Sequence, residues 1–286
     1  MPRRVLILVL AAALSLTACQ STTPSPHKPV TTTATPTPAA VQRYVALGDS
    51  TVAGPVLRPQ RPRQPAGCAR SQVNFVSLLA TSLRAERFVD ASCSGARTAD
   101  LLTSHGEAPA QLRSVTAATD LVTLGPIGAN DIGLVGALTR CIFGDCGREL
   151  RGLDGRVAAI GPPLRRALAA IHRRAPGAAV LVIGYGRYLP TGACPAVEPV
   201  SATDGNHAQR LLSSINRVLA AAAQRAGARY VDLATMPGSA EHTTCANSAQ
   251  RWYAGIAPAD PDGALPYHPT KLGMKAVAAH LAAVLR

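Results

Sequence analysis

The sequence predicts an α/β protein in which a parallel sheet of five strands lies between two layers of helices. Short apolar runs alternate with longer amphipathic segments along most of the chain, as they do in proteins built of β-α units. Some of these runs are apolar at every position, which is typical of strands buried on both faces. The 286 residues, 47% of them hydrophobic, are enough for the core of one large domain.

Turn formers separate the expected elements along the chain. The predicted strands span residues 43–47, 88–91, 121–124, 179–183 and 229–233. The predicted helices run from about 73 to 83, 157 to 174, 206 to 226, and 269 to the C-terminus. The second of these helices stops at Pro176-Gly177, because proline and glycine end helices. In such a sheet the ligand site lies beyond the carboxyl ends of the strands.

The N-terminus has the pattern of an export signal. Arg3 and Arg4 precede an apolar run that ends at Leu16 and is too short to span a membrane. The sequence Leu-Thr-Ala-Cys that ends at Cys19 resembles a bacterial lipobox, in which the cysteine carries lipid. An ordinary secretory signal with a chance cysteine is the alternative. We therefore predict a lipoprotein signal peptide at 1–18, a Thr/Pro-rich tether at 19–42 and one folded domain at 43–286.

The chain is strongly basic, with a formal net charge of +13. Its basic residues are mostly scattered arginines, and the dense run at 58–63 has no aromatic residues between its charges. Because an exported protein rarely meets nucleic acid, we expect no nucleic-acid partner. The charge instead indicates a solvated surface with some affinity for anionic lipid or cell-wall polymer.

Six cysteines remain if Cys19 is lipidated. Export implies an oxidising compartment, where disulfides persist, and six is an even number. Metal binding is the alternative, but the spacings include no C-x-x-C pair and no histidine cluster accompanies them. Of fifteen possible pairings, neighbouring positions favour Cys68–Cys93, Cys141–Cys146 and Cys194–Cys245. We expect no metal site.

Four short blocks carry residues suited to ester hydrolysis. Such a reaction needs a nucleophile, a base and donors for a negative oxygen. These needs match Ser50 after the first strand, Gly95 and Asn130 after the second and third, and His268 before the last helix. Each block also has a simpler interpretation. Ser50 and Gly95 could be ordinary turn residues, and Asn130 with Asp131 could do no more than form a turn and cap the helix that follows.

Together the blocks Gly-Asp-Ser at 48–50, Ser-Gly at 94–95, Asn-Asp at 130–131 and His-Pro at 268–269 resemble the SGNH (GDSL) hydrolase family. The sequences that flank these blocks are similar to those of the exported actinobacterial lipases and esterases of this family. The resemblance implies a flavodoxin-like three-layer α/β/α fold and three disulfides. It implies Ser50 as nucleophile, His268 as base, and an oxyanion hole formed by the Ser50 and Gly95 amides with the Asn130 side chain. It implies no cofactor.

The chain departs from the family pattern in two places. Ala129 stands where the family usually has glycine, and Gly125-Pro126 lengthens the same loop. Leu265 occupies the position where an aspartate commonly orients the histidine. We therefore expect the Leu265 backbone carbonyl to orient His268. The alternative is a carboxylate from Asp262 or Asp260, six and eight residues before the histidine.

The function that these features favour is that of a lipid-anchored extracytoplasmic serine hydrolase that cleaves acyl esters. Its expected partners are an ester substrate and, through the N-terminal lipid, the membrane, and we expect a monomer. One alternative is a cell-wall polysaccharide O-acetylesterase, but aromatic residues, at 3%, leave little for stacking sugars. Another is a binding lipoprotein without catalysis, which the missing aspartate keeps open.

Overall fold

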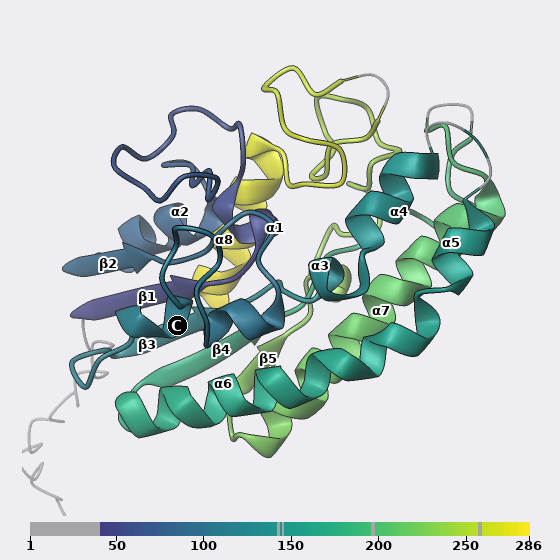
Figure 1. Cartoon of the computed structure of the whole chain (residues 1–286). Coiled ribbons are helices and arrows are strands. Elements are labelled where there is room, and N and C mark those ends of the chain that lie inside the picture. The colour runs from purple at the N-terminus through teal and green to yellow at the C-terminus, as the bar shows by residue number, and fades with distance from the viewer. Residues whose placement is uncertain (1–40, 142–143, 145, 196–197, 257–258) are drawn as a thin grey trace, which may run out of the picture. The chain divides into compact units, whose positions relative to one another are not determined.

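A central parallel sheet organises the structure, a computed structural model that describes residues 41–141, 144, 146–195, 198–256 and 259–286 (Figure 1). These residues belong to one of the chain's two units, Pro38–Arg286. The predicted signal peptide, Cys19 and nearly all of the predicted tether lie outside the described residues. No helix in the described ranges is both long and apolar enough to cross a bilayer.

The five strands are all parallel and follow the order β2-β1-β3-β4-β5. They are β1 (Arg43–Leu47), β2 (Arg87–Asp90), β3 (Leu121–Leu124), β4 (Ala179–Ile183) and β5 (Arg229–Val231). Every residue of β3, and all but the first of β1 and β4, are buried, because helices cover both faces of the sheet. The predicted fold class and strand positions are confirmed, with small shifts at β2 and β5.

Two helix pairs form the outer layers. On one side of the sheet α2 (Phe75–Ser82) packs on α8 (Lys271–Val284), and on the other α6 (Gly161–Arg174) packs on α7 (Ala202–Arg225) (Figure 1). Capping side chains set several of the helix starts. Asn74, Ser201 and Thr270 accept backbone N–H groups at the first turns of α2, α7 and α8.

The helix boundaries differ from the predicted ones where local signals compete. The segment predicted to open the second helix forms a 3₁₀ helix, η3 (Asp154–Ile160), before α6 begins at Gly161. The α7 helix begins at Ala202, four residues before the predicted start, because Ser201 caps it.

Short helices fill the connections between these elements. They are α1 (Ser50–Ala53), α3 (Ala129–Ile132), α4 (Leu134–Cys141), α5 (Gly147–Arg151), η1 (Thr98–Leu101), η2 (Gln111–Ser114) and η4 (Leu233–Thr235). Several of them follow the carboxyl ends of strands and so surround the site described below.

Three disulfides tie these connections, and all three predicted pairings are confirmed. Cys68–Cys93 links the loop before α2 to the loop after β2. Cys141–Cys146 joins the end of α4 to the start of α5. Cys194–Cys245 joins two long loops, one before α7 and one after β5.

Candidate active site

Ser50 lies on a sharp turn directly after β1. A side chain at Gly48 would place its Cβ 2.3 Å from a methyl group of Val52, so only glycine fits there. The side-chain amide of Gln111 holds the same residue by accepting from its N–H at 2.8 Å and donating to its carbonyl at 2.9 Å. Asp49 then caps α1 by accepting the Thr51 N–H at 2.8 Å. The half-buried Ser50 is thereby fixed as the first residue of a helix.

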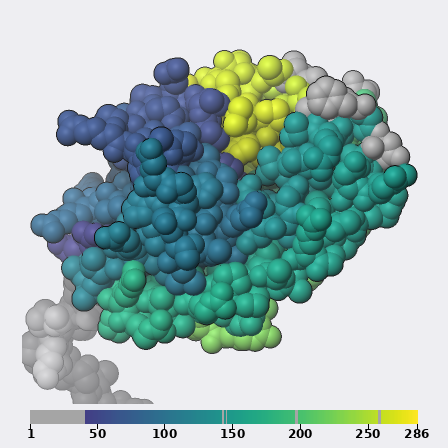
Figure 2. Space-filling view, viewed as in Figure 1, coloured from purple at the N-terminus to yellow at the C-terminus, as the bar shows by residue number. Residues whose placement is uncertain are grey.

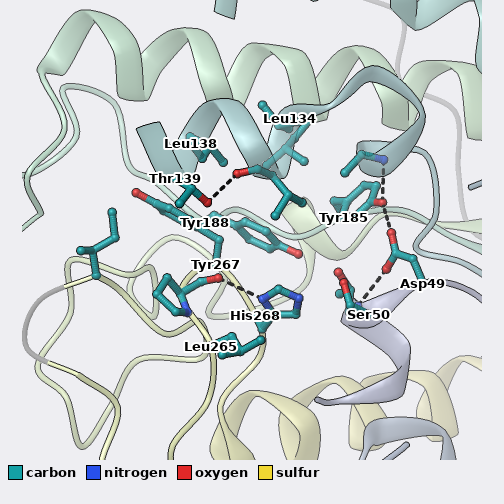
Figure 3. Close-up of a pocket in the computed structure, with 16 residues that line it drawn as sticks. Asp49, Ser50, Leu134, Leu138, Thr139, Tyr185, Tyr188, Leu265, Tyr267 and His268 are labelled. Carbon is teal, nitrogen blue, oxygen red and sulfur yellow. Dashed lines mark hydrogen bonds between the residues drawn. The ribbon is translucent and has the colours of Figure 1, made fainter. Parts of the chain in front are cut away.

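His268 lies on the loop that leads into α8. Its backbone carbonyl accepts the Ala254 N–H at 2.9 Å, and the Ala254 carbonyl accepts the Tyr267 N–H at 2.7 Å. Tyr267 adopts a positive φ of 58°, which turns the chain sharply just before the histidine. The His268 ring faces Ser50 across a pocket that both residues line (Figure 3).

The environment of His268 favours a neutral imidazole. The residue is buried, and loss of solvent lowers its pKa below the usual value, although the hydrogen bond to Pro266 opposes this shift. The Nδ1 atom lies 2.9 Å from the Pro266 carbonyl oxygen. Because a carbonyl only accepts, Nδ1 carries the proton in this arrangement, and the lone pair is on Nε2.

The group that orients His268 differs from the expected one. The Leu265 carbonyl accepts the backbone N–H of His268 at 3.1 Å. This bond closes a backbone turn and does not orient the imidazole ring. The expectation for Leu265 was therefore wrong by one residue, since the ring bonds to Pro266. The left-handed conformation of Tyr267 accounts for the shift, because it changes the direction of the chain between that carbonyl and the histidine.

The two candidate carboxylates have other partners. Asp262 forms an ion pair with Lys271 at 3.0 Å. Asp260 accepts the backbone N–H groups of Asp262 at 3.0 Å and Ala264 at 3.2 Å, and so closes its own turn. The alternative in which either carboxylate orients the histidine is thus not the arrangement in this structure.

The Gly95 and Asn130 blocks are bound to each other. The Asn130 side chain donates to the Ala96 carbonyl at 3.0 Å, directly beside Gly95. Next to this contact, the Thr98 N–H donates to the Asp131 carboxylate at 2.9 Å. Gly95 has a positive φ of 79°, which glycine adopts without strain. The loops after β2 and β3 therefore form one unit.

Comparison of the sequence with protein-family models identifies the family of this chain. The model described as "GDSL-like Lipase/Acylhydrolase family" matches residues 46–276. The chain belongs to this family. Lipase 2 of Streptomyces coelicolor is 33% identical to this GDSL-family hydrolase over 259 residues, 85% of each chain. A lipase of Streptomyces rimosus is 33% identical over 235 residues, 80% of this chain and 81% of its own.

Solved structures agree with this assignment. The phospholipase A1 from Streptomyces albidoflavus superposes on the GDSL-family hydrolase with a TM-score of 0.73 at 26% identity, covering 85% of this chain and 99% of its own. The extracellular lipase from Streptomyces rimosus has a TM-score of 0.70 at 30% identity over the same shares. The protein is a carboxylester hydrolase with the three-layer fold of these lipases.

The pocket of this GDSL-family hydrolase is apolar. It has a volume of about 260 Å³ and begins at Ser50 and His268. Its walls come mainly from α4, the segment after β4 and the loop before α8, with Leu212 added from α7. Its aliphatic lining residues include Leu134, Val135, Leu138, Leu212, Ile256 and Leu265. On the molecular surface the yellow C-terminal segment lies against the teal segment that carries α4 (Figure 2). Val135 and Leu265 remain 43% and 40% exposed, which places apolar groups at the rim.

Two residues that support the site were not predicted from the sequence. Gln111 holds the Gly48 backbone, as described above. Tyr185, two residues after β4, lines the pocket, and its hydroxyl donates to the Asp49 carboxylate (Figure 3). Burial raises the pKa of Asp49 to about 7 despite this bond. A single glutamine or tyrosine belongs to no motif with a characteristic spacing. The available signal was the position of Tyr185 just after a predicted strand, and Gln111 had none.

Proposed function

We propose that Ser50 and His268 form a catalytic dyad that cleaves acyl esters through an acyl-enzyme. The observation that carries this proposal is the His268 ring, which bonds to the Pro266 carbonyl through Nδ1 and faces Ser50 in an apolar pocket that both residues line (Figure 3). A base held in this tautomer is ready to accept the serine proton. The carbonyl takes over the orienting task that an aspartate performs in a triad.

The reaction proceeds in two displacements. His268 accepts the proton of the Ser50 hydroxyl as Oγ attacks the ester carbonyl carbon. The resulting oxyanion is bound by the Ser50 and Gly95 amides and by the second N–H of the Asn130 side chain, whose first N–H donates to Ala96. The tetrahedral intermediate collapses, and the alcohol leaves with the proton from His268. Water then repeats the sequence on the acyl-enzyme and releases the acid.

The pocket supports fatty-acyl rather than acetyl substrates. Aliphatic side chains such as Leu134, Leu138 and Leu212 line it, and burial of one CH₂ group contributes about 0.8 kcal/mol. An acetyl group would leave most of these walls unused. A polysaccharide O-acetylesterase would gain nothing from such walls, and a binding protein would not need a base in the active tautomer.

A series of p-nitrophenyl esters tests this substrate class. We expect kcat/KM to rise about fourfold for each added CH₂ until the pocket is filled, since 0.8 kcal/mol corresponds to that factor. Leu138→Trp, which fills part of the pocket, should move the optimum to shorter chains. Leu272→Trp is the matched control on an exposed leucine of α8. A maximum at acetate would favour the O-acetylesterase, and no turnover of any ester would favour the binding lipoprotein.

We also propose that the hydrolase is exported and anchored by lipid at Cys19. The lipobox-like sequence before this cysteine supports the anchor, and three disulfides support an oxidising compartment. A fatty-acid analogue supplied to the expressing cells should label the wild type and should not label Cys19→Ser. The variant should appear in the medium with unchanged esterase activity. Equal labelling of both proteins would exclude the anchor.

A further inference from the structure

The Tyr185 hydroxyl connects two parts of the site that come from different strands. It donates to Oδ2 of Asp49, in the turn after β1, and accepts at 3.0 Å the N–H of Ala129, the first residue of α3 (Figure 3). Asp49 precedes Ser50, and Ala129 precedes Asn130. The hydroxyl thus lies between the residue before the nucleophile and the residue before a proposed oxyanion donor.

Tyr185 is itself held in place by a side chain of α7 and by close packing around its two neighbouring glycines. The Asn216 side chain on α7 accepts the Tyr185 N–H at 2.8 Å and donates to its carbonyl at 2.8 Å. The flanking glycines leave no room for side chains. A Cβ at Gly184 would lie 2.3 Å from the Tyr230 hydroxyl, and one at Gly186 would lie 1.8 Å from that of Tyr253. The backbone at this position therefore has little freedom to move.

We propose that Tyr185, acting with Asp49, is a positioning residue that sets the placement of Ser50 relative to Asn130 on α3. This inference rests on the proposed function, because it concerns the same dyad and oxyanion donors. The Tyr185 hydroxyl is bonded to Asp49 and Ala129, and not to Ser50 or His268. Tyr185 acts through the two backbone segments to which its hydroxyl is bonded.

The chemistry of the hydroxyl explains why tyrosine suits this position. The hydroxyl accepts one N–H and donates one O–H, and Asp49 and Ala129 present the matching groups. Burial and the nearby Asp49 carboxylate raise the pKa of Tyr185, so its proton stays on the oxygen. Phenylalanine would leave the Ala129 N–H and one Asp49 oxygen without this partner in a buried setting, where each loss loosens the geometry.

Tyr185→Phe tests the proposal through the separation of kcat from KM. We expect kcat to fall about 10²-fold, as a small misplacement of reacting groups does, with KM within threefold of the wild-type value. The control is Tyr44→Phe, which removes another buried tyrosine hydroxyl, bonded to Thr123 at 2.7 Å in the core. It should lower the melting temperature similarly and leave kcat unchanged.

A second variant and a transition-state analogue complete the test. Asp49→Asn keeps an oxygen for the Thr51 cap but cannot accept the Tyr185 O–H with its amide nitrogen, so kcat should fall about 10- to 10²-fold. The double variant should lose no more than the worse single variant. An alkyl boronic acid, which forms a tetrahedral adduct with serine, should bind each variant more weakly in proportion to its kcat/KM. If Tyr185→Phe does not fold, the kcat of Asp49→Asn tests the positioning role instead.

Two results would overturn the positioning role while leaving the dyad intact. One is a kcat for Tyr185→Phe within threefold of wild type in an enzyme that Ser50→Ala inactivates. The other is a loss confined to KM, or matched by Tyr44→Phe, which would mark a binding or purely structural effect. Absence of turnover in the wild-type enzyme itself would instead refute the proposed function.

Discussion

Replacing Ser50 by alanine should lower kcat on p-nitrophenyl butyrate on the order of 10⁶-fold, as loss of the nucleophile does in other serine hydrolases. The remaining groups have no hydroxyl from which His268 could accept a proton, so no acyl-enzyme forms. Alanine suits the first position of α1, and the Asp49 cap on Thr51 does not involve the Ser50 side chain. The folded structure should therefore remain, with a melting temperature within a few degrees of wild type.

A fluorophosphonate probe gives the second measurement on the same variant. It should label the wild-type enzyme at the peptide that contains Ser50 and should leave Ser50→Ala unlabelled. Ser82→Ala, at the exposed end of α2, is the matched control and should react like the wild type. Labelling that persists in Ser50→Ala would assign the nucleophile to another residue.

Replacing His268 by alanine should lower kcat on the order of 10⁶-fold, because the nucleophile and the base of the proposed dyad would act as a unit. The substrate pocket should remain, so KM should change far less than kcat. Measurement of kcat and KM for both variants and for the double variant Ser50→Ala/His268→Ala checks this. The double variant should be no slower than either single one, and additive losses would contradict a dyad.

Asp262→Asn distinguishes the dyad from a triad. Asp262 forms an ion pair with Lys271 in the structure, and the Pro266 carbonyl accepts from the His268 ring. The variant should keep most of its kcat. A loss on the order of 10⁴-fold, as follows removal of the triad aspartate elsewhere, would show that a carboxylate orients the histidine during turnover.

The strands could be predicted from the sequence because their signals are local, and the disulfides because cysteines that follow one another along the chain pair with each other. The β3 and β4 segments are continuous apolar runs between turn formers, and they were found at their observed ends. The short helices α3, α4 and α5 were not predicted. They are four to eight residues long, and packing rather than propensity forms them.

The site was predictable only as far as it depends on sequence blocks. The blocks led to Ser50 and His268, and the structure places both at one pocket. The choice between the Leu265 and Pro266 carbonyls depends on the positive φ of Tyr267, an uncommon conformation for a tyrosine that nothing in the sequence indicates. The role inferred for Tyr185 depends on contacts among three strand ends and has no sequence motif.

The candidate catalytic residues and much of the aliphatic pocket wall come from different segments of the chain. Ser50 and His268 are fixed by turns next to the sheet and α8, whereas one face of α4 supplies Leu134, Val135, Leu138 and Thr139 to the wall. This helix begins just after the Asn130 block, and the Cys141–Cys146 disulfide closes its far end. Natural variation or a designed library confined to these four positions could therefore retune acyl preference while the hydrolytic machinery stays intact. Substitutions on α4 would then change which ester the enzyme prefers, while Ser50 and His268 stay unchanged.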